Sequence, residues 1–117
     1  MRKFSFTKAD RILHRAEFVQ ISETGSKIQN RHFIVMYRPG RFDRSRLGIT
    51  ASRRVGKAVT RNRIKRFARE YFRLNRKEMT GNWDINLIIK KEAAGLSSQE
   101  VFSSLQDILG RIGVSGR

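Results

Sequence analysis

The sequence has 117 residues and a formal net charge of +16, from 26 Lys and Arg against 10 Asp and Glu, and it contains no cysteine. Eight Phe and 38% hydrophobic residues favour one folded domain with a modest core over a disordered basic tail. The lack of cysteine excludes disulfides, thiolate metal sites and cysteine nucleophiles. No apolar run approaches the ~20 residues of a membrane span, and the N-terminus has no signal-peptide pattern. We therefore expect one soluble, cytoplasmic domain over residues 1–117, with residues 1–10 and 113–117 flexible.

The first half of the chain predicts one helix and two strands. Apolar residues at helical spacing predict a helix over 15–24, which Gly25 ends as a C-cap. The β-rich segment 32–37 and the segment 47–52 predict strands. The pattern also leaves room for an extra strand at 27–29.

The second half predicts a long helix, a strand and a last helix. The long helix runs from Val59 to Met79, and the apolar segment 85–90 predicts a strand covered on both faces. Ser97 and Glu100 form the S-x-x-E pattern of a capping box, which opens a last helix with apolar residues at helical spacing up to residue 112. The order α-β-β(β)-α-β-α predicts an α+β fold with helices packed on a single mixed sheet.

Helical phasing divides the long helix into an apolar face and a cationic face. Because the cations share one side of a helix, they form a rigid surface and not a disordered arm. The apolar stripe expected to face the core consists of Ile64, Phe67, Ala68, Tyr71 and Leu74. The opposite side carries Asn62, Arg66, Arg69, Arg73 and Lys77; Lys65 and Arg76 extend it, and Arg61 and Arg63 flank it.

This helix belongs to a basic block, residues 53–77, that has eleven Lys or Arg and a single acid, Glu70. Like charges at helical neighbour spacing repel, so the block indicates a polyanionic partner. Nucleic acid is the leading candidate, and an anionic membrane or an acidic protein is the alternative. A membrane-bound helix would need its apolar face free, whereas a domain of this size needs that face for its core.

RNA is a better candidate than DNA. The sequence has no C2H2 finger, zipper or convincing helix-turn-helix pattern, so no DNA partner is expected. Exposed aromatic residues beside cations would favour single-stranded or irregular RNA. Phe18, Phe33 and Tyr37 are candidates for this role, although each also suits the core.

The residues Arg61-Asn62-Arg63, continuing through Glu70, resemble the signature of the protein subunit of bacterial ribonuclease P. Segment 46–60 leads into this signature as the strand and loop of that family do. Segments 15–18, 25–33 and 83–90 fit the family as well, so the resemblance spans roughly residues 10 to 112.

The resemblance implies a fold of the ribosomal protein S5 domain 2-like type, with a left-handed β-α-β crossover. It also implies a role in removing the 5′ leader from precursor tRNA. In that family the protein binds a catalytic RNA and the leader, and the RNA holds the active site and requires Mg2+. The resemblance therefore implies no cofactor on the protein itself, no membrane partner and no catalytic residue in this chain.

The resemblance carries over to two groups of residues. The loop before the long helix extends the surface that the signature is expected to turn toward RNA, through Arg53, Arg54 and Lys57. The expected RNA-binding residues are thus Arg61, Asn62, Arg63, Lys65, Arg66, Arg69, Arg53, Arg54, Lys57 and Arg73. The expected leader cleft, between the first helix and the sheet, contains Phe18, Ser22, Phe33 and Met36. Ser22 and Met36 replace aromatics found in some members, so this cleft would bind more by backbone and shape.

The pattern of acids and histidines does not predict a nuclease site in the protein. A protein nuclease needs converging carboxylates for metal ions or a histidine pair for acid–base chemistry. The ten acids are scattered, His14 and His32 are isolated, and no metal site is predicted. Two alternatives stay open: a ribosome-associated or general RNA-binding protein, and a protein nuclease that acts alone.

Overall fold

A four-stranded sheet forms the centre of the computed structural model, which describes residues 10–12, 14–40, 42–79 and 81–112. The strands lie in the order β1-β2-β4-β3; β1–β2 and β2–β4 are antiparallel and β3–β4 is parallel. This confirms the mixed sheet and the extra first strand. The strands are β1 (Ser26–Gln29), β2 (Phe33–Pro39), β3 (Arg46–Ala51) and β4 (Trp83–Ile89).

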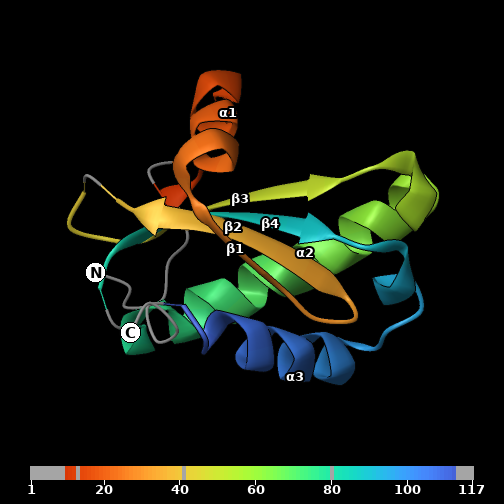
Figure 1. Ribbon diagram of the computed structural model, residues 1–117. Coiled ribbons are helices and arrows are strands. Elements are labelled where there is room, and N and C mark those ends of the chain that lie inside the picture. The colour runs from red at the N-terminus through yellow and green to blue at the C-terminus, as the bar shows by residue number, and fades with distance from the viewer. Residues whose placement is uncertain (1–9, 13, 41, 80, 113–117) are drawn as a thin grey trace.

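Three α-helices of the described chain cover the two faces of this sheet. The first, α1, stands on one face, which we call the outer face, while α2 and α3 lie on the other, the helical face (Figure 1). The helix α2 connects the parallel strands β3 and β4, so the β-α-β unit is confirmed. The helices are α1 (Arg15–Thr24), α2 (Ala58–Asn75) and α3 (Ser98–Leu109), with 3-10 turns η2 (Arg53–Val55), η3 (Arg76–Glu78) and η4 (Lys91–Ala93).

Two predicted helix ends are confirmed by their hydrogen bonds. The N–H of Gly25 donates to the Ile21 carbonyl and ends α1. A Cβ at Gly25 would lie 2.5 Å from the Ile21 oxygen and 2.6 Å from the Tyr37 oxygen, so only glycine lets the chain turn this closely into β1. At the start of α3, Ser97 and Glu100 make both hydrogen bonds of the capping box.

The main core lies between the helical face and the two helices on it. The helices contribute the residues Ile64, Ala68, Phe72, Val101, Leu105 and Ile108, and the strands contribute Phe33, Val35, Ile85 and Leu87. The predicted stripe on α2 is wrong at one position, because Leu74 is 38% exposed and Phe72 is buried in its place. The buried row runs i, i+4, i+8 along α2 against the sheet, while Tyr71 packs edge-on against Phe102 of α3.

The chain termini fall partly outside the structural description. Residues 1–9 and 113–117, which we expect to be flexible, lie outside the described residues. Asp10 is described and is 2% exposed. Its carboxylate pairs with Arg44 at 3.1 Å and with Arg76 at 2.6 Å, so this residue ties the start of the chain to two later segments. No helix in the described part of the chain is long and apolar enough to cross a membrane.

Candidate nucleic-acid interface

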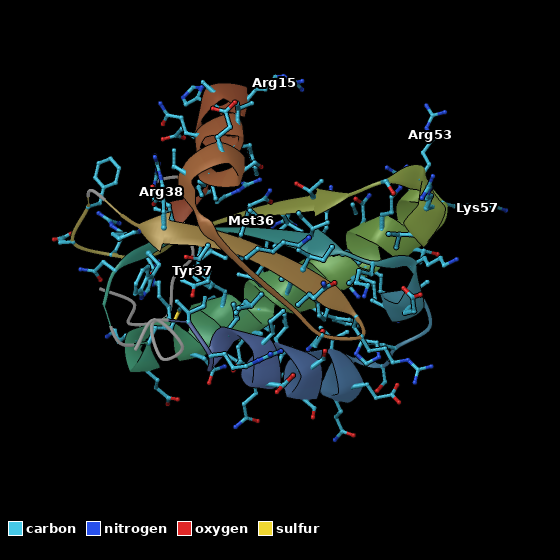
Figure 2. The ribbon with its side chains drawn as sticks, in the orientation of Figure 1. Arg15, Met36, Tyr37, Arg38, Arg53 and Lys57 are labelled. Atoms are coloured by element: carbon cyan, nitrogen blue, oxygen red, sulfur yellow. The ribbon has the colours of Figure 1, made fainter. Side chains whose placement is uncertain are left out.

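The strand alternation sorts the predicted cleft residues between two faces of the sheet. Met36 pairs with Asn86 and points with it to the outer face, on which Phe18 and Ser22 of α1 also lie. Figure 2 shows Met36 in the middle of the sheet, below α1. Phe33 does not belong to this cleft, because it is 0% exposed and packs in the core on the helical face. Of the two aromatic residues predicted for the cleft, only Phe18 of α1 therefore lies on this face.

Phe18 reaches the sheet because of a glycine. A Cβ placed on Gly48 of β3 would lie 2.5 Å from Cε1 of Phe18, well inside van der Waals contact. The missing side chain therefore lets the half-buried ring lie directly on the strand. Ile21, also from α1, is fully buried on this side of the sheet. These contacts fix the position of α1 on the outer face of the sheet.

A buried arginine also holds α1 against the sheet. The Arg46 guanidinium donates from Nε and Nη2 to the two carboxylate oxygens of Asp84, each at 3.0 Å, and from Nη2 to Glu17 at 2.8 Å. These three residues come from β3, β4 and α1. The hydrogen bond that Arg46 donates to Asp84 is the main cause that raises the pKa of Arg46, so the guanidinium stays charged despite burial. The network joins α1 to the two parallel strands.

A second surface, the cationic face of α2, begins at the end of β3. Asn62 and Arg66 are exposed on it, and Lys65, Arg69 and Arg73 are partly exposed. Figure 2 shows Arg53 and Lys57 extending outward from the turn that precedes α2, and Arg54 is exposed in the same turn. All ten predicted RNA-binding residues are thus exposed or partly exposed, along one helix and its entry loop.

The two flanking arginines of the signature make contacts within the protein. Arg61 donates from Nε to the Gly56 carbonyl at 3.1 Å, which holds the entry loop against the helix. Arg63 donates to the carbonyls of Leu96 at 3.0 Å and Ala94 at 2.7 Å, which ties α2 to the segment before α3. Their guanidinium groups therefore have a structural function as well as a charge.

Glu70, the single acid of the basic block, forms an ion pair with Arg73. Arg73 donates from Nε to Glu70 at 3.2 Å, and the pair is exposed. The hydrogen bond from Arg73 is the main cause that lowers the pKa of Glu70. Lys65, Arg66 and Arg69 have no carboxylate of the described residues at ion-pair distance. The α2 surface thus keeps most of its positive charge.

Comparison with known proteins identifies the family to which the chain belongs. The sequence model of the ribonuclease P family, described as Ribonuclease P, matches residues 6–113. The chain belongs to this family. The ribonuclease P protein component of Desulforapulum autotrophicum is 46% identical over 112 residues, which cover 96% of each chain.

Solved structures of the ribonuclease P family agree with this fold. The Staphylococcus aureus RNase P protein superposes with a TM-score of 0.84 at 35% identity, over 92% of this chain and 98% of that one. The Thermotoga maritima protein superposes with a TM-score of 0.81 at 36% identity, over 87% of this chain and 96% of that one. The predicted α+β architecture is therefore confirmed at the level of the whole domain.

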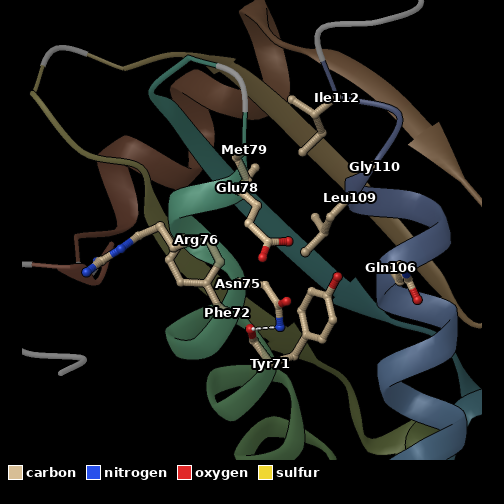
Figure 3. A pocket seen from close by; sticks show the side chains of 10 residues that line it. All are labelled: Tyr71, Phe72, Asn75, Arg76, Glu78, Met79, Gln106, Leu109, Gly110 and Ile112. Carbon is tan, nitrogen blue, oxygen red and sulfur yellow. Dashed lines mark hydrogen bonds between the residues drawn. The ribbon is translucent and has the colours of Figure 1, made fainter. Parts of the chain in front are cut away.

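Two cavities of the domain differ in the residues that line them. One cavity of about 210 Å³ lies between the C-terminal ends of α2 and α3, where Tyr71, Phe72, Met79, Leu109 and Ile112 make it largely apolar (Figure 3). A smaller one, of about 170 Å³, lies at the edge of β3 and is lined by Arg11, Lys65 and Arg69 together with Phe18. Sequence reasoning missed Arg11, because only the fold brings it from the N-terminal segment to α2.

Proposed function

We propose that this chain is the RNA-binding, noncatalytic protein component of ribonuclease P, and that it assists removal of the 5′ leader from precursor tRNA. The observation that carries the proposal is the pair of adjoining surfaces described above. One is the outer face of the sheet beside α1, where the leader cleft is expected and which suits a single strand. The other is the cationic face of α2, which suits a folded RNA with dense phosphates.

The two surfaces suggest a division of labour. Phe18 offers an aromatic ring, and Asn86 and Thr50 form a polar strip linked by a 3.0 Å hydrogen bond on the same face. Aromatic rings bind unpaired bases by stacking, without demanding a particular sequence. We assign the leader to this surface, and the catalytic RNA to the entry loop and the side of α2 that carries Asn62, Arg66 and Arg73.

The buried carboxylates support a noncatalytic role for the protein. Asp84 and Glu17 are engaged by Arg46, and Asp10 is engaged by Arg44 and Arg76. A carboxylate committed to an ion pair with an arginine is not free to bind a metal ion or to activate a water molecule. We therefore assign the hydrolysis, and the Mg2+ that it requires, to the RNA partner.

Reconstitution with the catalytic RNA tests the proposal. The protein should lower the Mg2+ concentration needed for precursor-tRNA cleavage, because its cations replace counterions that the two RNAs otherwise need. Cleavage should be measured over a Mg2+ series at low monovalent salt, with and without protein. An unchanged Mg2+ requirement would leave a general RNA-binding protein as the better explanation.

A second arm omits the catalytic RNA. The protein alone should leave precursor tRNA intact at any Mg2+ concentration. One solved relative is described as a Staphylococcus aureus RNase P protein mutant with defective mRNA degradation activity. An mRNA therefore belongs among the substrates of this arm. Cleavage of either RNA by the purified protein would contradict the noncatalytic assignment. A contaminating nuclease is excluded as its source if mutation of a surface residue of the protein abolishes the cleavage.

A further inference from the structure

Three cations converge at the free edge of the sheet without a described acid to neutralise them. Arg11 forms a parallel bridge with Leu47 of β3, the edge strand, and the next N–H, of Ile12, donates to the Leu47 carbonyl at 3.1 Å. Lys65 and Arg69 approach the same edge from α2, one helical turn apart. No described carboxylate lies within ion-pair distance of these three side chains.

This arrangement is unfavourable in the free protein. Burial, and then the charge of Arg11, lower the pKa of Arg69. Both effects mean that the folded state penalises this guanidinium charge. A group of like charges held together at such a cost suggests a ligand that compensates it. The ligand must be anionic.

The cavity between the three cations has room for an anionic group of that ligand. Its volume of about 170 Å³ is enough to hold a phosphate group. Phe18 and Gly48 form its wall on the side of the cleft, and Lys65 and Arg69 form its wall on the side of α2.

The position of the cavity identifies which phosphate it takes. It lies where the outer face, with the cleft, meets the cationic face of α2 around the edge of β3. We propose that Arg11, Lys65 and Arg69 bind one phosphodiester of the precursor-tRNA leader, at the point where the leader leaves the cleft and turns toward the catalytic RNA. A base next to that phosphate contacts the ring of Phe18. This inference rests on the proposed function, and it adds Arg11 and a specific crossing point to it.

The test compares Arg11→Gln with Arg31→Gln. Arg31 is an exposed arginine in the turn between β1 and β2, at the opposite edge of the sheet, so the charge removed is the same. Holoenzyme reconstituted with each variant is titrated with precursor tRNA carrying a long leader, with a precursor whose leader is a single nucleotide, and with mature tRNA. Lys65→Gln serves as a second variant of the site.

Arg11→Gln and Lys65→Gln should each weaken binding of the long-leader substrate about tenfold, the effect of one charge-assisted hydrogen bond. Binding of the single-nucleotide leader and of mature tRNA should change little, and Arg31→Gln should change none of the three. Without RNA, the Arg11→Gln protein should be at least as stable as the wild type, because a repulsion is removed. A merely structural arginine would instead lower the midpoint of unfolding when it is replaced.

Two results would overturn the site. One is equal loss with all three substrates, which would place the cations against the catalytic RNA. The other is equal behaviour of Arg11→Gln and Arg31→Gln. In either case the proposed function stands if the wild-type protein still lowers the Mg2+ requirement. If the wild-type holoenzyme needs as much Mg2+ as the RNA alone, the result would instead contradict the proposed function itself.

Discussion

Arg46 shows how a single residue can connect the stability of this domain to its binding surface. Its guanidinium is buried beside Asp84 and Glu17, and the ring of Phe42 lies 4.7 Å from its central carbon. A buried charge is tolerated only when it is paired and hydrogen-bonded, so each partner is needed for the other. Because Glu17 belongs to α1, the same contacts determine where one wall of the cleft stands.

Asp84→Ala should therefore be costly. The substitution leaves the Arg46 charge buried with Glu17 alone, and breaking a buried pair in this way destabilises a protein by about 3 kcal/mol or more. Urea unfolding at neutral pH measures the loss. Glu70→Ala is the matched control, because its pair with Arg73 is exposed to solvent and should contribute far less to stability. Equal costs for the two substitutions would contradict the structural role given to Arg46.

Gly48→Ala tests the fit of Phe18 against β3. The added methyl group would overlap the ring, since its carbon would lie 2.5 Å from Cε1. We expect the ring to shift, and the affinity of the holoenzyme for long-leader precursor tRNA to fall about five- to tenfold, at the lower end of the range for one base–aromatic contact. Gly95→Ala is the control, because nothing lies within 4 Å of its added carbon. Unchanged leader affinity in Gly48→Ala would show that Phe18 does not contact the leader.

At the scale of elements, α2 combines two kinds of arginine that the sequence does not distinguish. Arg63 and Arg66 both belong to the signature stretch, and the guanidinium carbons lie 5.6 Å and 5.4 Å from the centre of the Phe67 ring. Arg63 also binds two backbone carbonyls before α3, whereas Arg66 is exposed. The first should therefore matter for stability and the second for RNA.

Arg63→Gln and Arg66→Gln form a matched pair for this prediction. Arg63→Gln should lower the free energy of unfolding by about 1–2 kcal/mol, because it leaves two partly buried carbonyls without their donor. Arg66→Gln should leave stability within about 0.5 kcal/mol and reduce the slope of log affinity for the catalytic RNA against log salt by about one unit. Chemical denaturation and RNA titrations at several salt concentrations give the two quantities. The reverse pattern would show that the assignments are exchanged.

Local signals in the sequence predicted the elements well where one short pattern determines the geometry. Gly25 and the Ser97–Glu100 box define helix ends through hydrogen bonds within a few residues, so no knowledge of the fold is needed. Phasing of α2 failed at Leu74, because the direction of its buried face depends on how the sheet and α3 surround it. Phe33 failed for the same reason, since strand alternation does not reveal which face carries the cleft.

The candidate site was predictable in charge but not in contacts. The signature indicated which residues carry the cations, yet it could not show that Arg61 and Arg63 bind carbonyls of the protein. Arg11 lies far from Lys65 in sequence, and only the bridge to Leu47 brings them together. Juxtaposition across the sheet edge is a tertiary property, and it has no signal in a single sequence.

The charges of the whole molecule are distributed unevenly between its helices. Residues 92–110, which include α3, contain three acids and no Lys or Arg, whereas residues 53–77 contain eleven cations and one acid. The strongly positive potential therefore belongs to α2, its entry loop and the edge of β3. A polyanion is therefore attracted mainly to that side of the domain.

This imbalance predicts opposite effects of salt on folding and on binding. At 10 mM salt the Debye length is about 30 Å, close to the longest extent of the molecule, 36 Å, so nearly all cations repel one another. At 1 M it falls to about 3 Å and the repulsion is screened. We expect the melting temperature of the protein alone to rise by about 5 °C or more between these conditions. RNA affinity should fall over the same range.

The control for this prediction is a double variant, Arg53→Gln with Arg66→Gln, in which both substituted residues are exposed. Because two repelling charges are removed, it should melt at a higher temperature than the wild type at low salt and gain less from added salt. Melting curves in NaCl, followed by circular dichroism, provide the comparison. A wild-type melting temperature independent of NaCl would mean that the cations are too far apart to repel. The cost that we attribute to the Arg11, Lys65 and Arg69 cluster would then lose its physical basis.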